Sequence, residues 1–464
     1  MPINSFVDYP MSWRPDRREL ERPIYLSLAR MLERDIARGF LPPGTKLPPQ
    51  RELADFLDIN FTTVTRAYKT CELKGLLHAV TGSGTFVSAT AARSVTISRD
   101  RVPLECIDFG LVASFEQSNF MVAEATRRVI ERSGLERLLN YDDPAGIPRQ
   151  RKIALRWMRS LGITASDPDQ VAVVSGAQNA LTIALLALFE PGSRIAVDEY
   201  TYSNFIELAK SLRIKLIPVP GDRSGMLPGE LDACCRASEL HGVFLMPSCC
   251  NPTAIFVPNE RRRELAAVIE AHRLIVIEDD IHAALLLGTT SEDGIPMREL
   301  LPEQTVYICS TTKSICSGLR VAFVVFPETM RERMLRAIYH VNVKTSSLDA
   351  EIVIETIDSG AAKDIVAYKK SLAKSANDLF AEYFPQPDDP GHPLSFFRWL
   401  RLPEPVHASR FESDLLARGV RVFHSDRFLV GSGSRDDHLR IALSSTGSLE
   451  ELRTGLEILR GSLN

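Results

Sequence analysis

The sequence predicts a two-part chain, in which a small helical head precedes a larger α/β body with a mostly parallel sheet. Its length of 464 residues is more than one compact core normally holds. Helical patterns dominate residues 21–88, where they end in a hairpin with a glycine-rich turn. From residue 171 onward, short apolar runs alternate with helical patterns, which is typical of a parallel sheet covered by helices.

Composition and charge exclude several classes of protein. Hydrophobic residues make up 45% of the chain, charged residues 25%, and the net charge is −4, so nothing indicates disorder or an acidic tail. The eight cysteines include no C-x-x-C pair, so we expect no metal site and regard them as packing residues. With no signal peptide and no membrane-spanning apolar run, a cytoplasmic protein without membrane contact is expected.

The head begins with a polar segment and an amphipathic helix. Residues 1–20 are mixed in character and are expected to form an arm rather than an element. Residues 24–39 have the four-residue apolar recurrence of a helix with one buried face. The recurring side chains are those of Ile24, Leu28, Leu32 and Ile36. Gly39 and the following proline turn end this helix.

Two shorter helical patterns follow in the head and predict a helix-turn-helix. They cover residues 51–57 and 62–74, and the tight connection at residues 58–60 joins them. The second helix opens with threonines and Arg66, groups that suit phosphates and base edges in a major groove. Residues 76–80 and 85–88 then form a hairpin, which completes a winged helix. A small helical domain with another binding role stays open, because such folds do not determine function.

The order of motifs in the head resembles the GntR family of bacterial winged-helix regulators. The stretch LPPGTKLPPQRELADFLDINFTTVTRAY, followed by GSGTFV, carries this resemblance over residues 21–88. The resemblance implies double-stranded operator DNA as a partner. It also implies DNA-contacting residues in the recognition helix, next to it and in the wing: Arg51, Thr63, Thr65, Arg66, Gly82 and Gly84.

Residues 89–112 lack a sustained period and are expected to be a linker, and residues 113–464 form the body. The predicted strands of the body lie at residues 171–175, 195–197, 215–219, 242–246, 274–277, 306–308 and 321–326. Parallel sheets bind ligands at the carboxyl ends of their strands, so we expect the functional residues there.

The stretch CSTTKSICSGLRVAF, residues 309–323, places one lysine between two apolar strands. Burial lowers the pKa of a lysine and frees its amine to form a Schiff base with a carbonyl. The hydroxyl of Ser310 and the guanidinium of Arg320 suit a phosphate. A solvated surface lysine is the alternative for Lys313.

The same stretch resembles the cofactor-lysine segment of fold-type I aminotransferases, S-x-x-K followed by G-L-R. This resemblance implies pyridoxal 5'-phosphate as the cofactor, joined to Lys313 as an internal aldimine, with Ser310 and Arg320 at its phosphate. Ser175-Gly176-Ala177-Gln178 ends a strand and opens a helix, whose free N–H groups suit a phosphate. In the resemblance Gly176, Ala177 and Gln178 form the phosphate cup.

Three further strand ends carry candidate residues. The pattern around Tyr202 implies a ring-stacking residue, although such an aromatic can also pack beneath the next helix. Asn251 in an Asn-Pro-Thr motif would donate to the phenolic oxygen of the cofactor, as in the similar NPTG motif. Among the carboxylates at residues 278–280, Asp279 would pair with the pyridinium nitrogen; a surface acid cluster is the alternative.

Two residues bear on what the body does with a ligand. Arg440 lies in an alternating run, residues 438–443, whose polar groups are expected to point outward. It matches the carboxylate-binding arginine of aminotransferases, with a structural ion pair as the alternative. Ile281 replaces the tyrosine of an E-D-D-Y motif and has no group for proton transfer, so efficient turnover is not expected.

The combined order of motifs resembles the MocR subfamily of bacterial regulators over nearly the whole chain. This resemblance implies a homodimeric, DNA-binding transcriptional regulator rather than an enzyme. Its body would sense an amino compound, or the cofactor itself, through an aldimine. Two alternatives stay open: a working aminotransferase with an appended DNA-binding module, and a scaffold without cofactor.

Overall fold

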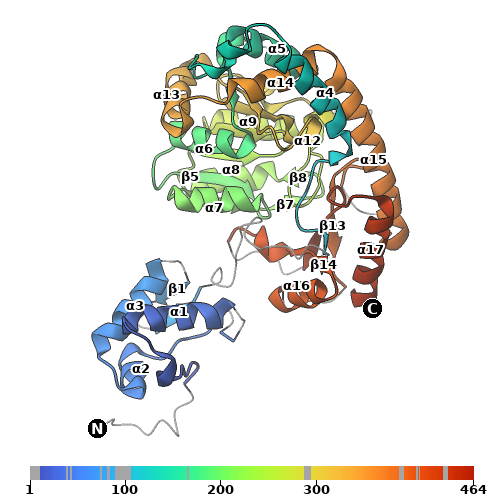
Figure 1. The fold of residues 1–464 in the computed structure, drawn as a ribbon. Helices are drawn as coiled ribbons and strands as arrows, with labels where there is room; N and C mark the ends of the chain where they lie inside the picture. Colours follow the sequence, from blue (N-terminus) through green and yellow to red (C-terminus); the bar gives the residue numbers. More distant parts are fainter. Residues whose placement is uncertain are drawn as a thin grey trace. The chain divides into compact units, whose positions relative to one another are not determined.

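A computed structural model describes the fold (Figure 1). The described residues are 11–37, 40–41, 44–73, 76–80, 84–88, 106–164, 167–286, 294–385, 391–403, 406, 408–431 and 437–463. The chain divides into two compact units, Met1–Ser94 and Val95–Asn464, here called the head and the body.

The head is a helix-turn-helix followed by a hairpin, as predicted. Its elements are α1 (Ile24–Ala37), α2 (Gln50–Leu57), α3 (Phe61–Leu73), β1 (Leu77–Val80) and β2 (Gly84–Val87). The strands pair antiparallel, with Leu77 opposite Val87. Buried apolar residues from all three helices form one core, and the hydroxyl of Tyr68 donates to the carbonyl of Pro48 within it at 2.9 Å.

The expectation of an arm is wrong for the described residues 11–20. A 3-10 turn, η1 (Arg17–Glu19), forms there, and Asp16 caps it by accepting from the N–H of Arg18. The indole of Trp13 is buried in the head core and donates to Asp35 of α1 at 2.9 Å. The sequence hid this packing because one tryptophan among polar residues gives no periodic apolar pattern. Residues 1–10 lie outside the described residues.

The body is built on a seven-stranded sheet, in which every strand predicted from an apolar run is present. Its strands are β4 (Val171–Val174), β5 (Arg194–Asp198), β6 (Lys215–Val219), β9 (Gly242–Leu245), β10 (Ile275–Asp279), β11 (Thr305–Ser310) and β12 (Ala322–Val325). Their order is β4-β12-β11-β10-β9-β5-β6. Only β12 runs antiparallel to its neighbours, so the sheet is mostly parallel, as predicted.

Helices cover both faces of this sheet, which explains why its strands are apolar on both sides. One face packs against α6 (Ala177–Leu188), α7 (Ser203–Ser211) and α13 (Arg331–Asn342). The other face packs against two sets of helices. One set is α5 (Pro148–Arg159), α14 (Ser347–Asp358) and α15 (Ala361–Tyr383). The other set is α8 (Pro228–Ala237), α9 (Asn259–Ala271) and α11 (Met297–Leu300).

The body contains further helices, strands and turns outside the central sheet and the helices that cover it. They are α4 (Asn119–Ile130), α10 (Ala283–Leu286), α12 (Thr311–Ser314), β7 (Gly221–Asp222), β8 (Gly225–Met226) and the 3-10 turns η2 (Glu116–Ser118), η3 (Leu135–Leu139), η4 (Pro168–Gln170), η5 (Glu328–Met330) and η6 (Ser425–Arg427). Among the described residues, no helix combines the length and the apolar character needed to cross a membrane.

The last part of the body forms a smaller layer beyond α15. A three-stranded antiparallel sheet, ordered β13-β16-β15, consists of β13 (Phe397–Arg401), β16 (His438–Ala442) and β15 (Phe423–His424). The helices α16 (Ala408–Ala417) and α17 (Leu449–Leu463) belong to the same region. Figure 1 shows this layer in orange and red.

The expected linker is shorter than predicted at its carboxyl end. Within residues 89–112, the segment β3 (Ile107–Asp108) pairs in parallel with β14 (Val420–Arg421) of the small layer. Asp108 also forms an ion pair with Arg421 at 2.5 Å. The described residues from 106 onward therefore belong to the body, whereas residues 89–105 lie outside the described residues.

Candidate functional site

The predicted site residues of the body follow the carboxyl ends of neighbouring sheet strands. Gly176 follows β4, Tyr202 follows β5 and Asn251 follows β9. Asp279 is the last residue of β10, and Lys313 lies in α12, directly after β11. Because parallel strands end at one edge of a sheet, residues far apart in the sequence meet there.

Lys313 is held in a dense and positively charged environment. Its ammonium group donates to the carbonyl of Val112, and its own carbonyl accepts from Lys369 at 3.0 Å and from Ser114 at 3.2 Å. Burial lowers the pKa of Lys313 to about 7, and the cations of Arg440, Lys369 and Arg320 add to this effect. A lysine with this pKa is largely uncharged slightly above neutral pH, so its amine is a nucleophile.

Arg320 and Gly176 lie directly against one another. Gly176 has a φ of +87°, and a Cβ atom there would lie 2.7 Å from Nη2 of Arg320. The backbone therefore requires glycine both for its conformation and for space. Thr312 links this arginine to Ser310, because its hydroxyl accepts from Ser310 at 2.8 Å and from Arg320 at 3.4 Å. A guanidinium, two hydroxyls and a helix start are thus brought together.

The helix start belongs to α6, which begins at Ala177. Its first N–H groups have no partner within the helix, which favours an anion at this end. Gln178 lies in the same first turn, and its buried side-chain oxygen has no hydrogen-bond partner in the described part of the chain. The backbone N–H of Ser175, two residues before α6 begins, donates to Oδ1 of Asn179 at 3.0 Å and so fixes the turn.

Glu278 and Asp279 at the end of β10 and Asp280 directly after it are all buried, which excludes a surface acid cluster. Glu278 accepts from the backbone N–H groups of Met297 and Arg298 at 2.8 and 3.0 Å. Asp279 is 2% exposed, and its Oδ1 has no hydrogen-bond partner within the described ranges. Burial, with a contribution from Asp280, raises the pKa of Asp279 to about 7. Among the residues that the structure describes, no cation forms an ion pair with this carboxyl group.

Arg440 points into the body, so the expectation that the polar groups of β16 face outward is wrong for this residue. It is 1% exposed, and it donates to Oδ1 of Asn251 at 2.9 Å and to the carbonyl of Gly110. The guanidinium lies 4.7 Å from the ring centre of Phe428, and its Nε has no partner in the described structure. Burial lowers the pKa of Arg440 to about 9.

This geometry disfavours a structural ion pair for Arg440, because no carboxylate of the described residues lies within ion-pair distance of it. A buried guanidinium without an anion is costly, and binding a carboxylate offsets that cost. Asn251 therefore orients Arg440 through its amide oxygen, while the amide nitrogen of Asn251 stays available to a further acceptor.

Tyr202 precedes α7, and its hydroxyl accepts from the amide of Asn204 at 3.1 Å. Burial raises the pKa of Tyr202, and nearby Asp279 adds to the rise, while Arg440 and Arg320 oppose it. Asp279, Arg440 and Arg320 are themselves predicted site residues, and all three lie close enough to Tyr202 to affect its pKa. Tyr200 instead packs edge-on against Trp399, with ring centres 5.3 Å apart. Between these two tyrosines, the N–H of Thr201 donates to the carbonyl of Phe428 at 2.9 Å and so holds the turn.

Sequence reasoning missed three residues of this site. Thr312 could have been found from its place inside the lysine motif. Lys369 of α15 and His282 carry no sequence signal that would distinguish them from ordinary residues. The His282 ring is buried edge-on against Phe396 and Phe397, and burial and the nearby charge of Lys313 lower its pKa to about 3. His282 is therefore a neutral imidazole close to the lysine.

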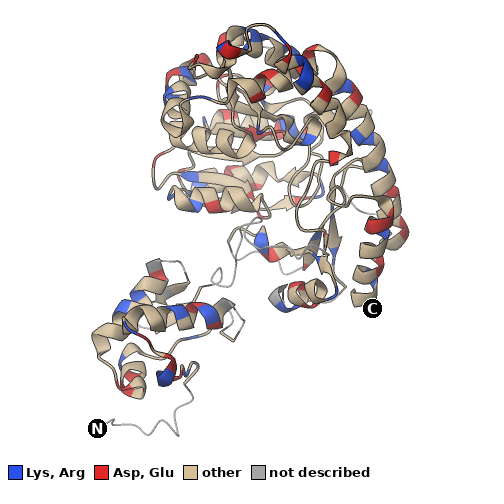
Figure 2. Ribbon diagram, viewed as in Figure 1, with Lys and Arg blue, Asp and Glu red and all other residues tan. Residues whose placement is uncertain are grey.

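Of the candidate DNA-contacting residues on the head helices, the two arginines are exposed. Arg66 stacks on the ring of Tyr25 at 4.1 Å, and Arg51 lies 5.7 Å from the ring centre of Phe61. Thr63 is half-buried, and the Thr65 hydroxyl is already engaged by Gln50 at 2.8 Å. Figure 2 shows basic and acidic residues interspersed over these helices.

The wing of the head supplies one glycine with a special conformation. Gly84 has a φ of +119°, and a Cβ there would lie 3.0 Å from the side chain of Lys46. Lys46 therefore lies beside the wing and is a further basic group that the sequence did not single out. Gly82 lies outside the described residues. No cluster of three or more potential metal ligands occurs among the residues that the structure describes.

Comparison with known families divides the chain in the same way. Residues 24–87 match the family "Bacterial regulatory proteins, gntR family", and residues 112–459 match "Aminotransferase class I and II". The HTH-type transcriptional regulator YdeF of Bacillus subtilis (strain 168) is 35% identical over the full length of this chain and 99% of its own. The probable rhizopine catabolism regulatory protein MocR of Rhizobium meliloti is 25% identical over 74% of this chain and 73% of its own.

Solved structures agree with the fold of the body. LysN, the α-aminoadipate aminotransferase of Thermus thermophilus, matches with a TM-score of 0.69 and 22% identity, over 78% of this chain and 92% of its own. That enzyme was solved in complex with N-(5'-phosphopyridoxyl)-L-leucine. The chain therefore belongs to the HTH-type transcriptional regulators of the MocR subfamily, which join a GntR-type head to an aminotransferase class I and II body.

Proposed function

We propose that this regulator binds pyridoxal 5'-phosphate at Lys313 and senses an amino compound, or the cofactor itself, to control its binding to operator DNA. The observation that carries this proposal is geometric: Lys313 lies directly after β11, in the same segment as Arg320, and the guanidinium of Arg320 lies directly against Gly176. When bound, the cofactor supplies an aldehyde carbon that combines with amines and a ring that withdraws electrons. The neutral amine of Lys313 is the group in this chain that reacts with such a carbon.

The residues around Lys313 fit the remaining parts of the cofactor. Arg320, Ser310, Gly176, Ala177 and Gln178 would hold the phosphate, since the space beside Gly176 admits no side chain and the N–H groups of α6 favour an anion. The other contacts come from three neighbouring strand ends. Asp279 would pair with the ring nitrogen, Asn251 would donate to the phenolic oxygen, and Tyr202 would lie against the ring.

Asp279 supports this assignment most directly among these residues. Its Oδ1 is buried without a partner in the described structure, and burial together with the charge of Asp280 raises its pKa to about 7, so a cation beside it would stabilise its charged form. A protonated ring nitrogen is a cation of the required kind. Arg440 is the corresponding case of a buried positive charge, because its guanidinium lacks a carboxylate among the described residues. We therefore propose that the effector carries an amine toward Lys313 and a carboxylate toward Arg440.

We propose that the regulator acts as a homodimer formed through the body. Exposed apolar side chains lie on or after α4, where Phe120 is 68%, Leu139 72% and Tyr141 87% exposed. Exposed apolar groups of this kind are typical of a protein interface. A dimer binds paired DNA half-sites only at a matching separation, so a change in the body alters operator affinity through the spacing of the heads. Because operator DNA lies in the cytoplasm of a bacterium, the proposal places the protein there.

Sensing rather than catalysis is favoured by Ile281. The side chain next to Asp280 has no hydroxyl and cannot transfer a proton. Neighbouring His282 has an imidazole, but its pKa of about 3 makes it a poor proton acceptor near neutral pH. A working aminotransferase remains the second candidate because the fold of the body is that of aminotransferases. Assays with saturating amino and keto acids distinguish them: sustained turnover favours the enzyme, and a single half-reaction or none favours the sensor.

The binding proposal is tested by absorbance spectroscopy and chemical trapping. The purified protein is reconstituted with pyridoxal phosphate, reduced with borohydride and digested for peptide mapping. We expect an absorbance band near the visible edge and a phosphopyridoxyl label on Lys313. A label on another lysine, or full retention of the band in Lys313→Ala, would contradict the proposal. Lys374→Ala is the matched control, because Lys374 lies exposed on α15 and pairs with Asp378 at 2.6 Å.

A further inference from the structure

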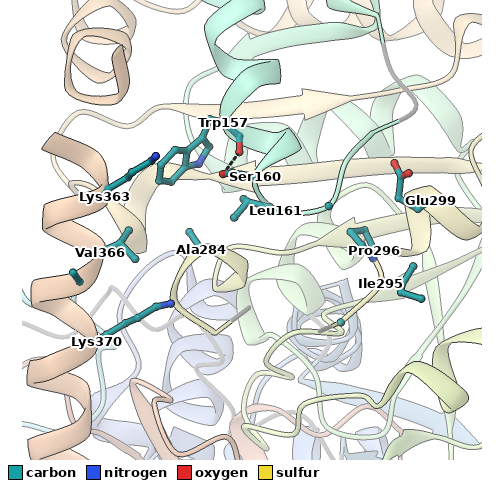
Figure 3. A pocket seen from close by; sticks show the side chains of 13 residues that line it. Trp157, Ser160, Leu161, Ala284, Ile295, Pro296, Glu299, Lys363, Val366 and Lys370 are labelled. Carbon is teal, nitrogen blue, oxygen red and sulfur yellow. Dashed lines mark hydrogen bonds between the residues drawn. The ribbon is translucent and has the colours of Figure 1, made fainter. Parts of the chain in front are cut away.

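Lys369 is a fully enclosed lysine of α15. Its exposed fraction is 0%, although lysine side chains are rarely buried without an acidic partner. Figure 3 shows two other lysines of the same helix, Lys363 and Lys370, extending toward a cavity beside it. None of the groups to which Lys369 donates lines that cavity. Lys369 contacts the Lys313 segment instead.

The three protons of the Lys369 ammonium group match three hydrogen-bond acceptors. The group donates to the hydroxyl of Ser114 at 2.7 Å and to the carbonyls of Ile315 at 2.9 Å and Lys313 at 3.0 Å. The two carbonyls lie at the end of α12, where a helix leaves carbonyl groups without intrahelical partners. Ser114 in turn donates to the carbonyl of Lys313 at 3.2 Å. One ammonium group thus joins α15, the Lys313 segment and the segment before η2.

These acceptors are neutral, so they do not account for the charge of Lys369. No carboxylate of the described residues forms an ion pair with it. Burial lowers the pKa of Lys369 to about 8, and Cys316 and Glu116 oppose this effect. Glu116 is exposed and accepts from the hydroxyl of Ser317 at 2.9 Å. A neutral amide donor would avoid most of the desolvation cost of an ammonium group, so the charge itself requires an explanation.

We propose that Lys369 is a positioning residue for Lys313, which fixes the backbone of that lysine and holds a positive charge beside its amine at neutral pH. This inference rests on the proposed role of Lys313 as the group that reacts with a carbonyl carbon. The hydrogen bonds determine where the Lys313 side chain begins. The charge disfavours the ammonium form of Lys313 and so favours the uncharged amine, which is the nucleophile.

Other charged groups also act on Lys313, and they come from several elements. Arg440 on β16 and Arg320 after α12 lower the pKa of Lys313 together with Lys369, whereas Glu116 in η2 opposes them. The two arginines were already assigned to a carboxylate and to a phosphate. Anions bound there would cancel much of their effect on Lys313. Lys369 has no such assigned anion, so its effect persists when those ligands are bound.

The order of the two lysine pKa values is consistent with this role. Lys313 has a pKa of about 7 and Lys369 a pKa of about 8, so Lys369 is still mostly protonated where Lys313 loses its proton. His282 adds no charge, because burial keeps its imidazole neutral in this range. The charge of Lys369 is therefore present over the pH range in which Lys313 becomes a nucleophile.

Competitive labelling of Lys313 with trace acetic anhydride tests the proposal. The full-length protein, freed of any bound aldehyde by dialysis against hydroxylamine, is labelled from about pH 5 to about pH 11. Peptide mass spectrometry then gives the labelling rate of Lys313, which is half-buried and so within reach of a small reagent. The pH of half-maximal rate reports the pKa of the amine. Because no cofactor is present, failure of the cofactor proposal would leave this measurement intact.

Four variants separate the charge of Lys369 from its hydrogen bonds. Lys369→Gln removes the charge and keeps an amide donor, and Lys369→Met removes both. We expect each to raise the midpoint of Lys313 labelling by about one pH unit. Ser114→Ala removes an acceptor of Lys369 and keeps its charge, so its midpoint should equal that of the wild type. Lys374→Met is the control on the exposed side of α15 and should also equal the wild type.

Three outcomes would overturn the proposal. The first is an unchanged midpoint in Lys369→Gln or Lys369→Met, measured on a variant with the circular dichroism of the wild type. The second is an equal shift in Lys369→Gln and Ser114→Ala, which would mean that the hydrogen bonds hold the structure and the charge has no part. The third needs no variant: a wild-type midpoint close to the ordinary lysine value of about 10.4 would exclude a cation acting on the amine.

Discussion

The head and the body of this regulator use arginine in opposite ways. In the head, Arg51 and Arg66 are exposed and lie over aromatic rings. In the body, Arg440 is fully enclosed, and its pKa is lowered by burial. Exposed charges attract any phosphate backbone but are screened by salt. For a buried arginine, the free-energy cost of desolvation is offset only when a well-placed anion binds.

The exposed arginines of the head suit affinity for nucleic acid in general, whereas the buried arginine of the body suits selectivity for one small molecule. The head is suited to follow a polyanion, and we propose that the few groups that read bases lie in α3. The body is suited to distinguish one small molecule, because each enclosed polar atom that stays unpaired costs free energy. Substitutions in the two regions should therefore have effects that differ in size and in salt dependence.

The largest effect is expected from Lys313→Ala. Loss of this amine should lower the affinity for pyridoxal phosphate by more than about 100-fold, because the covalent attachment point is removed. Absorbance after dialysis measures the retained cofactor, and binding of the head to non-specific DNA should not change. A loss of DNA binding in parallel would show that the variant had failed to fold or that the two regions are not separate.

The next largest effect is expected from Arg440→Lys. We expect the affinity for amino acids to fall by about 100-fold, because lysine cannot donate two parallel hydrogen bonds to a carboxylate. Titrations of the cofactor absorbance with amino acids and with the corresponding amines measure this change. The amines lack the carboxylate, so their affinity should be the same in both proteins; equal losses would contradict the assignment.

A smaller effect, sensitive to salt, is expected from Arg66→Ala in the head. DNA affinity should fall by about tenfold at low salt, and the slope of log affinity against log salt should decrease by about one. Fluorescence anisotropy at several salt concentrations measures both quantities. The cofactor absorbance should not change, and an unchanged salt slope would exclude a phosphate contact by Arg66.

The smallest effect concerns the stability of the apoprotein. The pKa of Lys313 is about 7 in the folded chain and 10.5 as an unperturbed lysine, so the unfolded state binds more protons between these values. Wild-type stability should therefore rise with pH across this window relative to Lys313→Met, by up to about 1 kcal/mol per pH unit. Near pH 7 the variant should be more stable by about 1–3 kcal/mol. Denaturant unfolding at pH 7 and 9 checks this, and a constant difference would contradict it.

Much of the fold could be predicted from the sequence because its signals are local. The apolar strands of the central sheet are buried on both faces, so each stands out as a continuous run. The site residues at their carboxyl ends follow from the same pattern, since the topology of a parallel sheet brings those ends together. Gly176 and Arg320 are an example: they are far apart in sequence and lie in contact.

The rest depends on long-range packing that a local pattern does not contain. Lys369 donates to Ser114, which lies 255 positions away in the sequence. The residues next to Lys369 in the sequence do not distinguish it from a lysine on the exposed face of a helix. Arg440 was expected to face outward because it alternates with apolar residues, yet that face of β16 covers the site. Trp13 and β3 were missed for the same reason, because their partners are in distant segments.

The central claim is that chemistry at Lys313 governs DNA binding by the head. The most direct test measures the affinity of the full-length, cofactor-loaded protein for DNA fragments that it selects from a random-sequence pool. Amino acids that change the cofactor absorbance are then added to the wild type and to Lys313→Ala reconstituted with free pyridoxal phosphate. The account predicts an affinity change of about fivefold or more in the wild type and none in the variant. An identical response in both proteins, or none in the wild type despite the absorbance change, would contradict it.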